Sequence, residues 1–234
     1  MHPLTRTARV TGLCYLSLAI SGALGFLITR PQLFVAGNAE ATLANLVEHE
    51  SLARIAIALE LLVVLTQAGT AVGFYRLFRT VDGTAAGSIA AFGMVNAIAI
   101  LGSAALLATA TEVASTPVGD AADTVQLLYL VSGNLWTVGG LFFGLWLVPM
   151  GWCVLRSGWL PRILGWILVV GGTGYLLHTF VAYLAPGAEA VADLLVVPAT
   201  VGEFWILGYL IIRGVRQQAL PPVAVPPVHP ATTA

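Results

Sequence analysis

Three ionisable side chains, Glu60, His178 and Glu203, fall inside long apolar stretches of the sequence. A charge at the centre of a bilayer costs about 2.5 to 3.5 kcal/mol on insertion scales, so such residues usually face a bundle interior or a water-filled cavity. Counted from the outer ends of their stretches they lie about six, six and nine residues deep, and each residue rises about 1.5 Å. We therefore predict that the three side chains lie at similar depth and share one polar site.

Four interpretations of this set are open. The residues could be structural hydrogen-bond partners between helices, or a proton relay or solute-transport site. They could also hold a metal with an activated water for hydrolysis, or line a pocket for a lipophilic ligand. The sequence has no HExxH motif, no paired-histidine motif and no nucleotide-binding glycine pattern. We therefore expect no cofactor, assign no metal site and favour a protein that is not an enzyme.

Three amides extend the candidate site. Gln67 lies seven residues after Glu60, on the same face of a helix. Asn96 and Asn134 lie in the third and fourth apolar stretches. We expect these amides to line the same interior volume.

Two arginines lie away from the others. Arg54 begins the second apolar stretch. It either snorkels to the membrane interface or pairs with Glu50 four residues earlier, or else it forms an anion-binding lip of the site. Arg30 stands beside Pro31 and is expected in a loop.

The composition indicates that these residues lie in a membrane protein. Of the 234 residues 58% are hydrophobic and 9% charged, with a mean hydropathy of +0.91, whereas soluble domains carry about 25% charged residues. Ten arginines face eleven acidic residues, so the net charge of -1 offers no general attraction for nucleic acid. An ordinary soluble protein and a nucleic-acid partner are both excluded, and the lipid bilayer is the expected surrounding.

Six stretches are long enough to cross a membrane, which takes about 20 apolar residues. We predict an all-α, polytopic membrane protein, a six-helix bundle forming one domain over residues 1–216. The fourth span is long and contains Pro149, so it is tilted, kinked or extended beyond the bilayer. The predicted spans are Val10–Ile28, Ile55–Phe78, Ile89–Ala110, Val125–Leu155, Ile163–Leu184 and Leu194–Ile212.

Two segments lie outside these spans. Between Thr29 and Ser51, apolar residues recur at helical spacing after Asn38, a good N-cap, which predicts a short amphipathic helix on the outer surface. Residues 217–234 are rich in proline and almost uncharged, which is typical of a disordered tail. We expect this tail in the cytoplasm.

The arginines determine the orientation. Six spans place eight of the ten arginines on one side, and the positive-inside rule makes that side cytoplasmic. We therefore predict a multi-pass protein of the cell (inner) membrane with both termini in the cytoplasm. The eight are Arg6, Arg9, Arg76, Arg79, Arg156, Arg162, Arg213 and Arg216.

Glycine pairs indicate close helix packing. Gly69 and Gly73 in the second span and Gly140 and Gly144 in the fourth form GxxxG patterns, which let helix backbones approach. The pattern does not separate contacts inside one bundle from a dimer interface, so a homo-oligomer is left open.

Three motifs carry a family resemblance. The run GWCVLRSGWLPRILG at residues 151–165 resembles the GYLIFRSGFLPRLLG pattern of a bacterial integral-membrane family, domain of unknown function 4386. ESLARI at residues 50–55 and VPATVGE at residues 197–203 resemble its ESLFRLG and VPALVGE segments. The resemblance covers Arg6 to Gly214 and departs where the family tends to have Asp, since this chain has Glu60 and His178. It implies a six-helix bundle and no activity.

These features together predict an integral membrane protein with an outward-biased polar site inside the membrane. The site suits binding or transport of a small solute or a lipophilic ligand, with proton linkage as an option. The alternatives are a membrane-embedded, metal-dependent hydrolase and a purely structural or partner-binding protein.

Labelling of single cysteines tests the orientation. Cysteines placed at Ser157 and Thr232 should resist a membrane-impermeant reagent added to intact cells and react after the membrane is opened, because both are predicted to be cytoplasmic. Reaction in intact cells would reverse the orientation and move the polar site to the inner half of the membrane.

Overall fold

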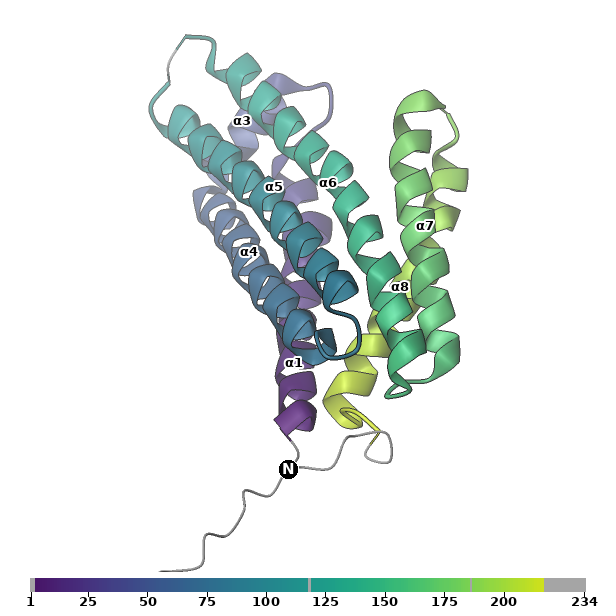
Figure 1. Ribbon diagram of the computed structural model, residues 1–234. Helices are drawn as coiled ribbons and strands as arrows, with labels where there is room; N and C mark the ends of the chain where they lie inside the picture. Colours follow the sequence, from purple (N-terminus) through teal and green to yellow (C-terminus); the bar gives the residue numbers. More distant parts are fainter. Residues whose placement is uncertain (1–2, 118, 186, 217–234) are drawn as a thin grey trace, which may run out of the picture.

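The described residues, 3–117, 119–185 and 187–216, form long helices joined by short connections in the computed structural model (Figure 1). In chain order the elements are α1 (Pro3–Gly22), the π-helical η1 (Ala23–Thr29), α2 (Arg30–Leu33), α3 (Ala39–Glu48), α4 (Glu50–Phe78), α5 (Gly83–Ser115), α6 (Ala121–Ser157), α7 (Arg162–Leu184) and α8 (Glu189–Ile212).

Six of these segments are long and apolar enough to cross a membrane, which confirms the predicted all-α fold with six spans. The first runs without a break from Pro3 to Leu33 through α1, η1 and α2. The loop expected at Arg30 is therefore wrong. Pro31 is the second residue of α2, which follows directly on the π-helical η1, and the helical run continues past it to Leu33. α6 likewise continues through Pro149. Its total length of 37 residues is well beyond what is needed to span a membrane.

α3 caps one end of the bundle. The Asn38 side chain accepts a hydrogen bond from the Ala41 N–H at 3.0 Å, as expected of an N-cap. The Thr42 hydroxyl donates to Gln126 of α6 at 2.8 Å, and Leu46 is fully buried. The position of this helix on the outer membrane surface stays a prediction, and the proline-rich tail lies outside the described residues.

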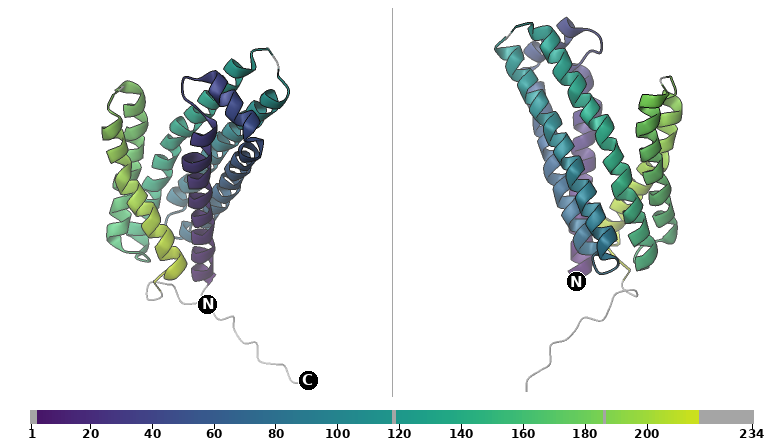
Figure 2. Two further views of the ribbon diagram at one scale, coloured as in Figure 1. Left: turned by 180° about the vertical axis from the view of Figure 1, so that it is seen from behind. Right: turned by 45° about the horizontal axis from the view of Figure 1, so that its top comes forward.

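Two separate clusters of buried apolar residues hold the helices together. The larger cluster joins α1, α4, α5, α6, α7 and α8 around Phe74 and Trp146. The smaller cluster lies at the α3 end and joins α2 to α6 around Leu33 and Tyr129, without a residue from α7 or α8. The α7–α8 pair therefore packs into a buried apolar cluster at one end only, and both views in Figure 2 show it diverging from the other helices toward the α3 end.

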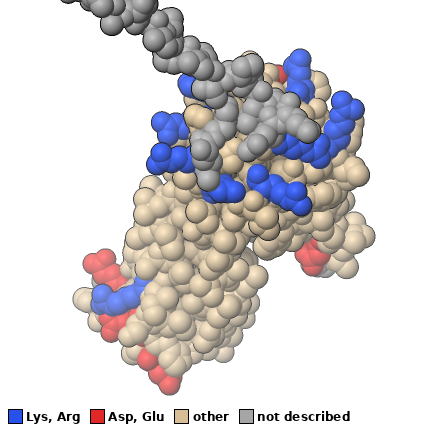
Figure 3. Space-filling view, turned by 90° about the horizontal axis from the view of Figure 1, so that it is seen from below, with Lys and Arg blue, Asp and Glu red and all other residues tan. Residues whose placement is uncertain are grey.

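The end of the molecule where α1 begins and α8 ends carries most of the arginines (Figure 3). We call it the arginine-rich end, and it contains the eight arginines that the sequence places on one side. Asp82, between α4 and α5, accepts hydrogen bonds there from Trp152 Nε1 at 3.1 Å and Arg156 Nη1 at 3.3 Å. The Ala85 backbone N–H and then the Trp152 indole lower the pKa of Asp82, so this carboxylate stays charged and ties the α4–α5 turn to α6.

Glycines allow backbones to touch inside the bundle. A Cβ placed on Gly73 would lie 2.3 Å from Thr11 Oγ1 of α1, and one placed on Gly144 would lie 2.7 Å from the Gly172 carbonyl oxygen of α7. The glycine at the end of each GxxxG pair therefore packs within the chain. α7 and α8 approach as closely, since a Cβ on Gly171 would lie 2.4 Å from Ala199 Cα.

These contacts predict opposite effects for two glycine substitutions. Gly171→Ala should destabilise the protein by about 1 to 3 kcal/mol, because the new methyl group meets backbone atoms of α8. Gly208→Ala should leave stability unchanged or raise it by up to about 1 kcal/mol, because its Cβ meets nothing within 4 Å and alanine favours helix. Thermal unfolding in detergent measures both. Equal melting temperatures for the two variants would contradict the close α7–α8 contact.

Candidate functional site

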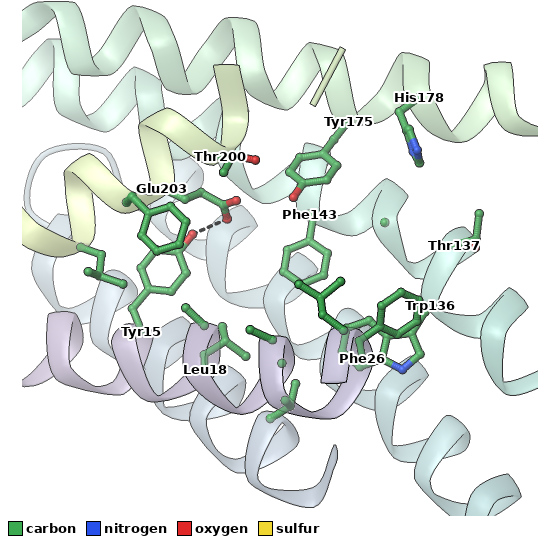
Figure 4. A pocket seen from close by; sticks show the side chains of 18 residues that line it. Tyr15, Leu18, Phe26, Trp136, Thr137, Phe143, Tyr175, His178, Thr200 and Glu203 are labelled. Carbon is green, nitrogen blue, oxygen red and sulfur yellow. Dashed lines mark hydrogen bonds between the residues drawn. The ribbon is translucent and has the colours of Figure 1, made fainter. Parts of the chain in front are cut away.

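A cavity of about 450 Å³ lies among α1, η1, α6, α7 and α8 on the side where α7 and α8 diverge (Figure 4). Its walls are mostly apolar and aromatic, and small residues such as Gly22, Ala23 and Gly140 leave the space open. A volume in this range is typical of sites for small organic molecules.

The mouth of the cavity is apolar. Phe26 and Leu27 of η1 are 38% and 69% exposed, and Phe204 of α8 is 61% exposed. Because these helices span a membrane, such exposed side chains face the lipid chains. The cavity is therefore bordered by side chains that face lipid.

Glu203 provides a carboxylate at the deep end of the cavity. The Tyr15 hydroxyl donates a hydrogen bond to Glu203 Oε1, and Tyr175 lines the cavity beside them (Figure 4). Tyr15 is itself held by edge-on contacts to Phe74 and Trp146, at centroid distances of 5.8 and 5.5 Å. In the part of the chain that the structure describes, no ion pair involves Glu203. A neutral donor therefore holds this carboxylate.

His178 lines the same cavity nearer its other end, on the side of Trp136 and Thr137 (Figure 4). It lies six residues before the end of α7, whereas Glu203 lies fourteen residues after the start of α8. α8 begins at Glu189, earlier than the Leu194 start expected from the sequence, so Glu203 is about 12 Å deeper along the helices. The expected similar depth of these two residues is therefore wrong, although one cavity contains both.

Glu60 belongs to a separate cluster behind the cavity wall. Its Oε1 accepts hydrogen bonds from Ser103 Oγ at 3.1 Å and Trp136 Nε1 at 3.0 Å, while its buried Oε2 has no partner among the described residues. Trp136 lines the cavity with its ring and turns its nitrogen away from it, toward Glu60 (Figure 4). The structure thus brings Glu203 and His178 into one cavity and places Glu60 behind Trp136.

Arg30 completes the Glu60 cluster and was missed as an intramembrane charge. Its guanidinium donates to Ser132 Oγ at 3.0 Å and to the Tyr129 carbonyl oxygen at 2.5 Å. Ser132 in turn bonds Ser103 at 2.8 Å, which connects Arg30 to Glu60 through two hydroxyl groups.

Aromatic rings also surround the Arg30 guanidinium. It lies 5.5 Å from the ring centres of Phe26 and Tyr129 and 5.7 Å from that of Phe34. Phe26 and Phe34 lie four residues to either side of Arg30, a helical spacing that could have indicated a buried cation.

Gln67 and Asn96 lie between α4, α5 and α6. Both are buried, and Gln67 Nε2 donates to the Gly93 carbonyl oxygen at 3.4 Å. Asn96 packs against α6, where a Cβ on Gly139 would lie 3.3 Å from its Oδ1. Neither residue lines the cavity.

Asn134 and Arg54 lie at the surface. Asn134 Oδ1 accepts a hydrogen bond from the Tyr183 hydroxyl at 3.2 Å. Arg54 pairs with Glu50 at 2.5 Å, which is the first of the two interpretations of this arginine. Neither residue lines the cavity.

A metal-ligand cluster is not found among the described residues, where no group of three His, Cys, Asp or Glu side chains could hold an ion. Glu203 instead faces phenols, and Glu60 faces a hydroxyl and an indole. Both carboxylates therefore accept hydrogen bonds from neutral donors.

A family model described as "Domain of unknown function (DUF4386)" matches residues 10–214. Comparisons with curated proteins and with solved structures found no match.

Two arginines at the same end of the bundle should differ in their contribution to stability. Arg30→Gln should destabilise the protein by about 1.5 to 3 kcal/mol, because it removes charge-assisted hydrogen bonds inside the bundle. Arg54→Gln should cost at most about 1 kcal/mol, because its ion pair is exposed. Chemical unfolding in mixed micelles measures the difference, and similar losses would contradict the structural role of Arg30.

Proposed function

We propose that this chain, which belongs to the DUF4386 family, is a multi-pass membrane protein that binds a lipophilic molecule through a cationic or hydrogen-bond-donating head group. One observation carries the proposal: an apolar cavity among the spanning helices has an apolar mouth and a carboxylate, Glu203, at its deep end.

The walls of the cavity select an apolar ligand body. Leu18, Phe143 and Leu207 offer hydrocarbon surface to the interior, and the mouth between η1 and α8 faces lipid. A ligand dissolved in the bilayer enters without crossing water. Because lipid chains are as apolar as the cavity walls, moving the ligand from lipid into the cavity gains no hydrophobic free energy. Close van der Waals packing against the walls has to stabilise the bound ligand.

The deep end selects the head group. The Tyr15 hydroxyl uses its proton on Glu203, so a bound molecule meets a carboxylate acceptor there. A protonated amine offers both donors and positive charge, and charge-assisted hydrogen bonds are stronger than neutral ones. A fatty acid would bring a second carboxylate to the same place and is disfavoured.

Cross-linking in lipid nanodiscs tests this site. A photoreactive C12 alkylamine should label residues of η1, α7 and α8 that line the cavity, and unlabelled dodecylamine should compete about tenfold better than dodecanoate. Ala19→Trp should lower the labelling about tenfold, because Ala19 lines the cavity and the indole would occupy it. The control Leu13→Trp, on the lipid-facing side of α1, should not.

Two results would contradict the proposal. Equal labelling of the Ala19→Trp and Leu13→Trp variants would show that the probe binds outside the cavity. Better competition by dodecanoate than by dodecylamine would overturn the assigned head group.

Proton-linked transport of the same ligand is a second candidate. It is supported by two carboxylates, Glu203 and Glu60, that lie in spanning helices and bond to neutral donors. Protonation of Glu203 would remove the charge that attracts an amine, so amine affinity should fall as the pH falls. Glu203→Gln should abolish this dependence in the same assay.

We also propose that the arginine-rich end faces the cytoplasm of a bacterial cell and that the protein lies in the inner membrane. The eight arginines at that end support this through the positive-inside rule. Phe26 and Leu27 of the cavity mouth then lie in the outer half of the bilayer.

A further inference from the structure

A second pocket, of about 570 Å³, lies at the arginine-rich end between the start of α1 and the end of α4. Arg6, Thr7 and Val10 of α1 and Gly69, Val72 and Arg76 of α4 are among its lining residues. It shares no residue with the cavity near Glu203.

Glycines shape this pocket. Gly69 and Gly73 line the pocket where α4 packs closely against α1, since a Cβ on Gly69 would lie 3.5 Å from Cys14 Sγ and one on Gly73 would meet Thr11. Val10 and Val72, both about half exposed, form apolar edges beside it. A groove of this shape can hold a hydrocarbon chain below a polar group.

The charge of the pocket is positive. Arg6 and Arg76 come from neighbouring helices, and no carboxylate lines the pocket. Within the described residues neither arginine takes part in an ion pair, and Asp82, the acidic residue of this end, is bound to Trp152 and Arg156.

The remaining polar groups of the pocket do not compete with the arginines. The Thr7 and Thr11 hydroxyls donate to backbone carbonyl oxygens of α1, at 3.2 and 2.8 Å. Pro3, the first residue of the 20-residue α1, also lines the pocket, so the positive end of the helix dipole faces it. The guanidinium groups are therefore the donors available to a ligand.

The pocket lies at the level where lipid head groups meet the protein. Arg6 precedes the apolar stretch that begins at Val10, and Arg76 lies two residues before the end of α4. Basic pockets between helices at this level attract anionic lipids, at about 1 kcal/mol for each arginine near the surface.

We propose that Arg6 and Arg76 bind a phosphate group in this pocket, and that the phosphate is the phosphodiester of an anionic phospholipid. The acyl chain lies along the groove between Val10 and Val72. A zwitterionic lipid carries a choline cation beside its phosphate, which the two arginines repel, so the pocket prefers lipids with net negative charge.

Native mass spectrometry of the full-length, delipidated protein tests this site with phosphatidylglycerol, phosphatidylcholine or inorganic phosphate added. The double variant Arg6→Gln/Arg76→Gln should bind phosphatidylglycerol about 30-fold more weakly than the wild type. The control Arg213→Gln/Arg216→Gln removes the same charge at the same end, outside the pocket, and should retain binding. Arg6→Lys/Arg76→Lys should restore most of the affinity, and an unchanged melting temperature in lipid-free detergent shows that each variant is folded.

The three added ligands and the control variant distinguish a lipid site from a free-anion site and from nonspecific binding. Phosphatidylglycerol binding that millimolar inorganic phosphate does not displace supports a lipid site, whereas displacement by phosphate overturns the lipid assignment and makes the ligand a free anion. Equal affinity for phosphatidylcholine and phosphatidylglycerol, or an equal loss in the Arg213→Gln/Arg216→Gln control, would overturn the pocket itself.

Discussion

The structure depends on how the α7–α8 pair is attached to the other helices. Glycines bring α7 against α6, where a Cβ on Gly144 or Gly151 would lie 2.7 or 2.5 Å from a carbonyl oxygen of α7. The large apolar cluster holds the same end, and the second cluster includes no residue of α7 or α8. Tight packing at one end and divergence at the other leave the cavity between them, so the space near Glu203 follows from where the backbones can touch.

Polar contacts inside the bundle connect segments that are far apart in the chain. Tyr15 and Glu203 are separated by 188 positions, and their hydrogen bond joins the first spanning helix to the last. Glu60, Ser103 and Trp136 join α4, α5 and α6 in the same manner. In a medium without water these groups have to find partners within the protein. Trp136 contacts both the cavity and Glu60, so a ligand in the cavity would touch a side chain that holds the second carboxylate.

α1 has a role at both ends of the molecule. Near the arginine-rich end it provides Arg6 and, with the glycines of α4, encloses a basic pocket. Further along, Tyr15 and Leu18 line the cavity, and η1 supplies its mouth. The same helix therefore contacts both the proposed phosphate group and the proposed lipophilic ligand, at different depths in the membrane.

The sequence by itself determined the six spans, the all-helical fold, the N-cap at Asn38 and the gathering of eight arginines at one end, because hydropathy, capping and charge are local along the chain. Only the tertiary structure decided which intramembrane charges meet. It placed Glu203 deeper than His178, put Glu60 behind Trp136 and brought Arg30 into the bundle. These outcomes depend on the rotation and axial register of each helix against its neighbours, which close glycine contacts and side-chain packing define and which hydropathy does not encode.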